Sequence, residues 1–66
     1  MILRTRIKEY RAKYNMSQSD LAGLVEVCRE TIGKLENGKY NPSLKLAMDI
    51  ARVFETTVED VFEFVE

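Results

Sequence analysis

Few side chains in this chain of 66 residues could carry out covalent or metal chemistry. The sequence has no histidine and a single cysteine, Cys28. Histidine-assisted nucleophilic catalysis therefore lacks its base, a Cys/His zinc site lacks its ligands, and no disulfide can form within one chain. We interpret the acidic residues Asp49, Glu59 and Asp60 as solvated charges rather than as a metal or acid–base site. The sequence thus predicts no catalytic residue, no metal site, no cofactor and no enzymatic activity.

Charge is the second chemical feature, and it is divided unequally along the chain. The net charge is −1, but residues 1–45 carry nine basic and five acidic side chains, whereas residues 46–66 carry one basic and six acidic side chains. The first part has a balance of +4 and the second −5, which together give −1. One end of the molecule is therefore suited to face a polyanion. Chance segregation over a solvated surface is the alternative.

Apolar spacing predicts that five short helices position these side chains. The first ends at Asn15, and its apolar face repeats every three or four residues: Leu3, Ile7, Tyr10 and Tyr14. Residues 17–20 resemble a capping box before a second helix with the stripe Leu21, Leu24 and Val25. A third helix starts near Cys28, turns Thr31, Ile32 and Leu35 inward, and stops at Asn37-Gly38, where glycine favours the left-handed conformation of a helix end.

Two further helices follow a loop at residues 39–42. Ser43 caps the fourth, whose buried stripe is predicted to be Leu44, Ala47, Ile50, Ala51 and Phe54. Residues 56–59 form a second capping box before a short fifth helix with Val58, Val61 and Phe62 apolar. We also predict that the apolar ends, residues 1–3 and 62–65, pair as a short two-stranded antiparallel ribbon. A frayed tail with a longer first helix is the alternative.

The stretch from Ser17 to Lys39 carries the functional signal. Two short helices are joined by a tight turn, with apolar residues at fixed offsets: Leu21, Ala22, Val27, Ile32 and Leu35. Ala22 is small enough for the two helices to cross closely, and Val27 closes the turn. Ile32 and Leu35 fix the helix that starts near Cys28 to the body of the domain. The opposite face of that helix is left free to enter a groove, as a helix-turn-helix requires.

The family resemblance starts from the segments between Ser17 and Lys39 and continues from Asn41-Pro42 to Phe62. In all, residues 7–62 resemble the Cro/cI-type (XRE family) helix-turn-helix DNA-binding domains. The short length and apolar ends look most like the small stand-alone dimeric repressors of the cytolysin-repressor type. The resemblance implies one all-α domain over residues 1–66, with five helices and the helix-turn-helix in helices 2 and 3. It implies that double-stranded DNA is the partner.

The resemblance also assigns roles to individual residues. Those that would read bases are Arg29, Glu30, Gly33 and Lys34. Those that would lie at phosphates are Gln18, Cys28, Thr31, Asn37, Gly38, Lys39 and Tyr40, with backbone amides offered at residues 37–39 and Gln18 alternatively bracing a base contact. Arg11 and Glu36 match a partly buried ion pair, to which we give a structural role.

Several residues depart from the family pattern. Glu26 stands where the inter-helix turn often has glycine, which predicts left-handed strain. Cys28 stands where serine or threonine is usual, and a thiol is a poor cap. A redox-sensing thiol and a tolerated small residue are the two interpretations of Cys28. Gly33 removes a side chain from the groove-facing surface.

Self-association is expected because paired units read paired half-sites. Six apolar residues in the region 46–66 suggest an exposed dimer interface: Leu46, Phe54, Val58, Val61, Phe62 and Phe64. Core packing is the alternative.

The predicted function is that of a cytoplasmic, homodimeric transcriptional repressor that binds an inverted-repeat operator. The alternative is an antitoxin-like protein-interaction module that also binds DNA. No run approaches the ~20 apolar residues of a membrane helix, the start does not resemble a signal peptide, and no small-molecule ligand is evident.

Overall fold

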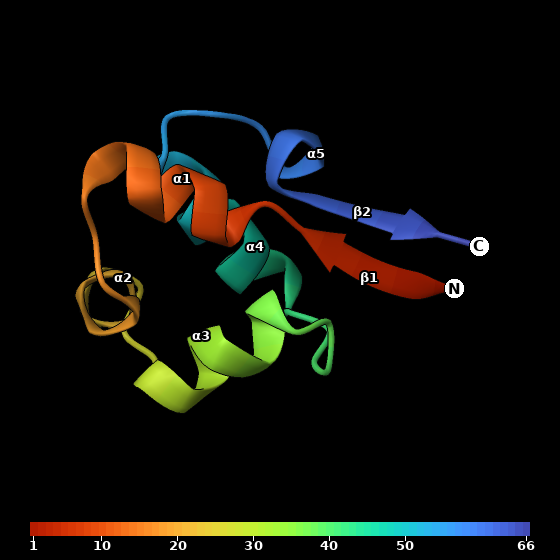
Figure 1. Ribbon diagram of the computed structural model, residues 1–66, viewed down its shortest axis with the longest axis horizontal. Helices are drawn as coiled ribbons and strands as arrows, with labels where there is room; N and C mark the ends of the chain where they lie inside the picture. The colour runs from red at the N-terminus through yellow and green to blue at the C-terminus, as the bar shows by residue number, and fades with distance from the viewer.

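A computed structural model describes residues 1–66, which form five helices and a two-stranded antiparallel ribbon (Figure 1). The elements follow in the order β1 (Ile2–Thr5), α1 (Ile7–Tyr14), α2 (Gln18–Leu24), α3 (Arg29–Glu36), α4 (Leu44–Val53), α5 (Val58–Val61) and β2 (Phe62–Val65). The helices gather in one body, and the ribbon extends from it with both termini at its free end (Figure 1). The predicted fold class and the ribbon are confirmed.

The ribbon corrects the predicted start of the first helix. β1 pairs with β2 in the register Ile2↔Val65 to Thr5↔Phe62, and α1 begins only at Ile7. Leu3 therefore lies in a strand, not on the apolar face of α1. Its side chain is still buried, against α3 and the core. The apolar character of Leu3, which suggested the inner face of a helix, therefore reflects burial from a strand.

Side-chain caps begin three of the helices. At Ser17 the capping box is complete: its hydroxyl accepts from the Asp20 amide at 2.9 Å, and its own amide donates to the Asp20 carboxylate at 3.0 Å. Ser43 caps α4 as predicted. At α5 the predicted box is wrong by one residue, because Thr57 is the cap and accepts from the Asp60 amide.

Left-handed residues follow four of the helices. They have positive φ angles at Asn15 (57°), Glu26 (61°), Gly38 (70°) and Glu55 (54°). The strain expected at Glu26 and the left-handed Gly38 are confirmed, whereas Glu55 was not predicted. Each of these residues reverses the chain within a few positions, which lets short helices pack on one another.

The core contains 14 buried residues, all of them hydrophobic. Leu24 and Leu44 were predicted to be buried, but they are 59% and 74% exposed. In α2 the inward positions are taken by Leu21, Ala22 and Val25. In α4 the residues facing the core are Leu46, Ala47, Ile50 and Ala51. Leu44 lies two residues before Leu46, about 200° around the helix, and so points outward.

The predicted exposed patch in residues 46–66 is also wrong. Four of its six residues are buried in the chain's own core: Leu46, Phe54, Val61 and Phe62. Phe54 is enclosed because Tyr10 and Tyr14 of α1 stack on it, with ring centroids 5.3 Å and 5.8 Å away. Val58 is half-buried, and only Phe64 is well exposed. Core packing accounts for most of this apolar set.

Candidate nucleic-acid interface

The α2–α3 pair is a helix-turn-helix whose inner faces are fully packed. Leu21, Ile32 and Leu35 have no exposed surface, and Ala22 is 3% exposed where the two helices meet. The left-handed Glu26 turns the chain, and the Val27 amide then donates to the Ala22 carbonyl at 3.0 Å. The predicted division of this unit into a buried and a free face is therefore present.

The free face of α3 holds the four residues predicted to read bases. Arg29, Glu30 and Lys34 are exposed, and Gly33 lies between them on the same helix. The Arg29 guanidinium and the Glu30 carboxylate lie 3.8 Å apart, with side chains 55% and 71% exposed. The pair is solvated and weak, so both side chains are available to a ligand.

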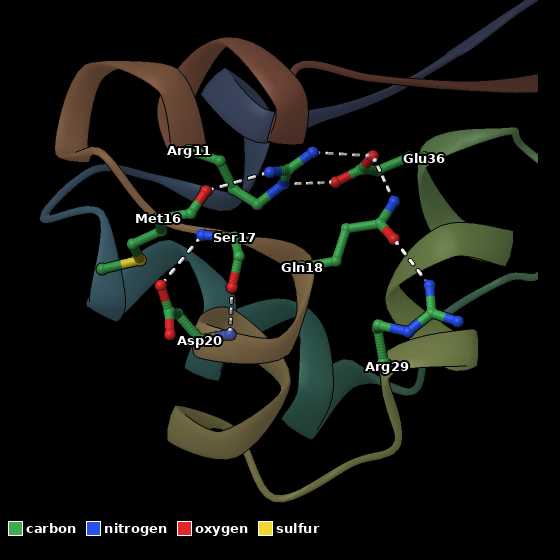
Figure 2. Close-up of polar contacts among 7 residues, drawn as sticks. All are labelled: Arg11, Met16, Ser17, Gln18, Asp20, Arg29 and Glu36. Carbon is green, nitrogen blue, oxygen red and sulfur yellow. Dashed lines mark hydrogen bonds and ion pairs between the residues drawn. The ribbon is translucent and has the colours of Figure 1, made fainter.

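A partly buried ion pair anchors α1 to the end of α3, as predicted (Figure 2). Arg11 donates from Nε to Glu36 Oε2 at 2.7 Å and from Nη2 to Oε1 at 3.2 Å. Its Nη1 donates to the Met16 carbonyl at 2.9 Å. The Arg11 and Glu36 side chains are 16% and 3% exposed. This two-bond geometry fixes the orientation of α3 relative to α1.

Gln18 connects that ion pair to the exposed face of α3 (Figure 2). Its side-chain nitrogen donates to Glu36 Oε1 at 3.0 Å, and its oxygen accepts from Arg29 Nη1 at 3.2 Å. The sequence suggested that Gln18 contacts a phosphate or braces a neighbour, and in this structure it braces Arg29. The bond from Gln18 to Glu36 was missed, because the two residues are 18 positions apart and share no helix face.

The backbone amides predicted to face a phosphate at residues 37–39 are already occupied. The amides of Asn37, Gly38 and Lys39 donate to the carbonyls of Gly33, Leu35 and Lys34 at 2.9–3.2 Å. These bonds close the end of α3 in a Schellman-type turn. The part of the prediction that relied on free amides is therefore wrong, although the side chains of Asn37, Lys39 and Tyr40 are exposed.

The other predicted phosphate contacts have different surroundings. Cys28 is exposed at the N-cap of α3, and its thiol makes no capping hydrogen bond. Thr31 is half-buried in the first turn of α3. Gly38 has a structural role: a Cβ atom added there would lie 2.6 Å from the Leu3 carbonyl oxygen. The helix end can approach β1 this closely only with glycine.

Comparison with known proteins agrees with this geometry. The family model described as "Helix-turn-helix" matches residues 7–61. An uncharacterized HTH-type transcriptional regulator of Archaeoglobus fulgidus is 66% identical over 97% of this chain and 90% of its own length. The crystal structure of the restriction-modification controller protein C.AhdI from Aeromonas hydrophila is 29% identical, with a TM-score of 0.76 over 83% of each chain.

The same fold also forms part of longer proteins. The chain spans 57% of the clp gene regulator ClgR from Corynebacterium glutamicum, with a TM-score of 0.75 at 22% identity. In the present chain, no helix has the length and apolar character needed to cross a bilayer. Two relatives of Archaeoglobus fulgidus, 66% and 63% identical to this chain, are both named as HTH-type transcriptional regulators. This chain belongs to the Cro/cI-type (XRE) helix-turn-helix family of DNA-binding transcriptional regulators.

Proposed function

We propose that this protein binds a specific double-stranded DNA operator as a homodimer and represses transcription in the cytoplasm by occupying that site. One observation supports this above the others: α3 is held by Ile32 and Leu35, which have no exposed surface, while Arg29, Glu30 and Lys34 on its other face are exposed. A rigid helix with a free polar face is what docking in the major groove requires.

Each residue of that face has a matching chemistry. Arg29 and Lys34 donate to guanine O6 and N7, and Glu30 accepts from cytosine N4. The open surface at Gly33 allows close approach of the α3 backbone to a base pair. Side chains around this face contact phosphates and set the register of the protein on the duplex: Cys28, Thr31, Asn37, Lys39 and Tyr40.

The dimer in this proposal uses the free end of the ribbon instead of the buried patch. Met1, Ile2 and Phe64 are 84%, 64% and 53% exposed there. Both termini lie at one end of the molecule (Figure 1), whose longest dimension is 31 Å. Two copies joined at this end have centres about one molecular length apart, close to the about 34–36 Å between half-sites one DNA turn apart.

Selection from a randomised duplex library tests the proposal. We expect the protein to enrich an inverted repeat and to bind it more weakly as salt rises. Recovery of no preferred sequence at low salt would refute the function.

Light scattering of wild type and Phe64→Glu tests the dimer. Leu24→Glu is the control, because it changes an exposed apolar residue outside the ribbon. A dimer that is lost in Leu24→Glu and kept in Phe64→Glu would refute the ribbon interface.

A further inference from the structure

The two sides of the terminal ribbon carry opposite charge. β1 and the residue after it hold Arg4 and Arg6 and no acidic residue, whereas α5 and β2 hold Glu59, Asp60 and Glu63 and no basic residue. The division of charge along the whole chain is thus repeated within this one element. The strand that lies on the side of α3 decides which charge the ribbon presents to DNA.

β1 is the strand on the side of α3 (Figure 1). The Arg6 amide donates to the Val61 carbonyl at 2.8 Å, and this pair continues the register of β1 and β2. Hydrogen-bonded pairs alternate along antiparallel strands, so the backbone groups of Leu3 point outward from the ribbon. The Leu3 carbonyl oxygen meets the end of α3, where a Cβ atom on Gly38 would lie only 2.6 Å from it. The outer edge of β1 therefore adjoins the end of α3.

Basic side chains continue across this junction. Lys39 directly follows Gly38, and Arg4 directly follows Leu3, so the two side chains flank one backbone contact. Both are exposed, and Lys34 in the last turn of α3 is exposed as well. Positive charge thus extends from the free face of α3, over the loop that follows it, onto β1.

The Arg4 guanidinium is available to an anion. Its Nε lies 3.9 Å from Glu63 Oε1, and that oxygen already accepts a hydrogen bond from Arg6 at 3.0 Å. The Arg4 side chain is 67% exposed, and an exposed pair at this distance is weak. Exchange of Glu63 for a DNA phosphate therefore costs Arg4 little.

We infer that β1 is a second DNA-binding element, in which Arg4 contacts a backbone phosphate and extends the phosphate surface of Lys39 onto the ribbon. This inference rests on the proposed function. In the proposed dimer the free end of the ribbon lies at the two-fold axis, so Arg4 lies between α3 and that axis. Its phosphate therefore belongs to the DNA between the two half-sites. A phosphate contact carries no sequence information, so Arg4 adds affinity and not base preference.

A matched pair of variants, Arg4→Gln and Arg52→Gln, tests the role of Arg4. The Arg52 side chain is 72% exposed and lies 3.9 Å from the Asp49 carboxylate, which reproduces the exposure and the weak pairing of Arg4. Arg52 lines a hollow with Thr56 and Val58, on the α5 side of the molecule. Each variant removes one positive charge, and thermal unfolding verifies that both are folded.

The salt dependence of operator affinity is the first readout. Loss of one phosphate contact from each protomer of a dimer should reduce the slope of log K against log salt by about 1.8. The advantage of wild type over Arg4→Gln should therefore shrink roughly 12-fold from about 50 to about 200 mM salt. Arg4→Gln should weaken the operator and its single-base variants by the same factor, and Arg52→Gln should keep the wild-type slope. An Arg4→Gln slope equal to that of Arg52→Gln would overturn the inference.

Neutral methylphosphonates in place of single phosphates locate the contact. One symmetric pair between the half-sites should weaken wild type and Arg52→Gln, with no further loss in Arg4→Gln. If Arg4→Gln retains every methylphosphonate effect of wild type, or loses only one outside the half-sites, the placement of β1 is overturned. A wild type that enriches no operator would refute the proposed function and this inference with it. Operator binding with an unaltered Arg4→Gln slope would overturn this inference alone.

Discussion

Three glycines offer the same substitution in three surroundings, and the structure predicts opposite effects on stability. Gly23 and Gly33 lie inside α2 and α3, and an added Cβ meets nothing within 4 Å at Gly23 and only the Gln18 side chain at 3.9–4.0 Å at Gly33. Alanine there removes the backbone entropy cost of a helical glycine. Each of these two variants should be more stable than wild type by about 0.5–1 kcal/mol.

Gly38→Ala should have the opposite sign. Gly38 has a φ of +70°, and an L-residue in that region costs about 1–2 kcal/mol. The new Cβ would also lie 2.6 Å from the Leu3 oxygen, well inside the 3.4–4 Å of ordinary contact. That oxygen belongs to the backbone of β1, so the strand or the helix end must shift, at an overpacking cost of about 1–3 kcal/mol. The sum is a loss of about 2–5 kcal/mol.

Thermal unfolding followed by circular dichroism measures all three variants. In a domain of this size each kcal/mol shifts Tm by about 4–8 °C. Gly38→Ala should therefore melt at least about 8 °C below wild type, and Gly23→Ala and Gly33→Ala a few degrees above it. A Gly38→Ala protein as stable as wild type would refute the close approach of the α3 end to β1.

Three further predictions concern single side chains. Arg11→Met should cost about 3–5 kcal/mol in urea unfolding, because it leaves Glu36 buried without its counter-ion; a loss under about 1 kcal/mol would contradict the buried pair. Cys28→Ser should raise stability by about 1 kcal/mol by adding the missing N-cap bond of α3, and an unchanged Tm would show that no such bond forms. Hydrogen bonds from the Thr56 hydroxyl, and then from Thr57, hold the pKa of Asp60 below its ordinary 3.8. Its ionised form therefore adds stability above pH 3.8 that is lost as the pH falls through the lower folded value. An NMR titration should place the Asp60 midpoint below 3.8 and show it rising in Thr56→Val; a wild-type midpoint at or above 3.8 would disprove the effect.

Much of the fold could be predicted because local signals agree with the tertiary structure. Ser17 with Asp20, Ser43, and the Asn37-Gly38 pair are short-range patterns that set helix ends regardless of the rest of the chain. The Arg11–Glu36 pair followed from the family resemblance rather than from spacing. The ribbon followed from the partial alternation of residues 62–65 and from the apolar residues 1–3 before the first helix.

The predictions that the structure overturned, and the contact that the sequence did not predict, depend on how the helices pack in three dimensions. Leu44 and Leu24 are apolar residues at helical spacing, yet neighbours two or three positions away occupy the inward directions. Phe54 was predicted both in the buried stripe of the fourth helix and in the exposed patch. Its burial agrees with the stripe, and its enclosure by Tyr10 and Tyr14 depends on how α1 packs against the end of α4. The link from Gln18 to Glu36 joins helices in space and leaves no periodic trace in the sequence.

In the proposed function, Arg29 on α3 reads a guanine in the major groove. The most direct measurement replaces each guanine of the selected operator in turn by 7-deazaguanine, which removes the N7 acceptor and leaves the minor groove and backbone unchanged. We predict that wild type loses affinity at the symmetric pair of guanines read by Arg29, and that Arg29→Ala shows no further loss at that pair. Equal wild-type affinity for every substituted duplex, or an undiminished loss in Arg29→Ala at every guanine that affects wild type, would contradict this reading of a guanine by Arg29.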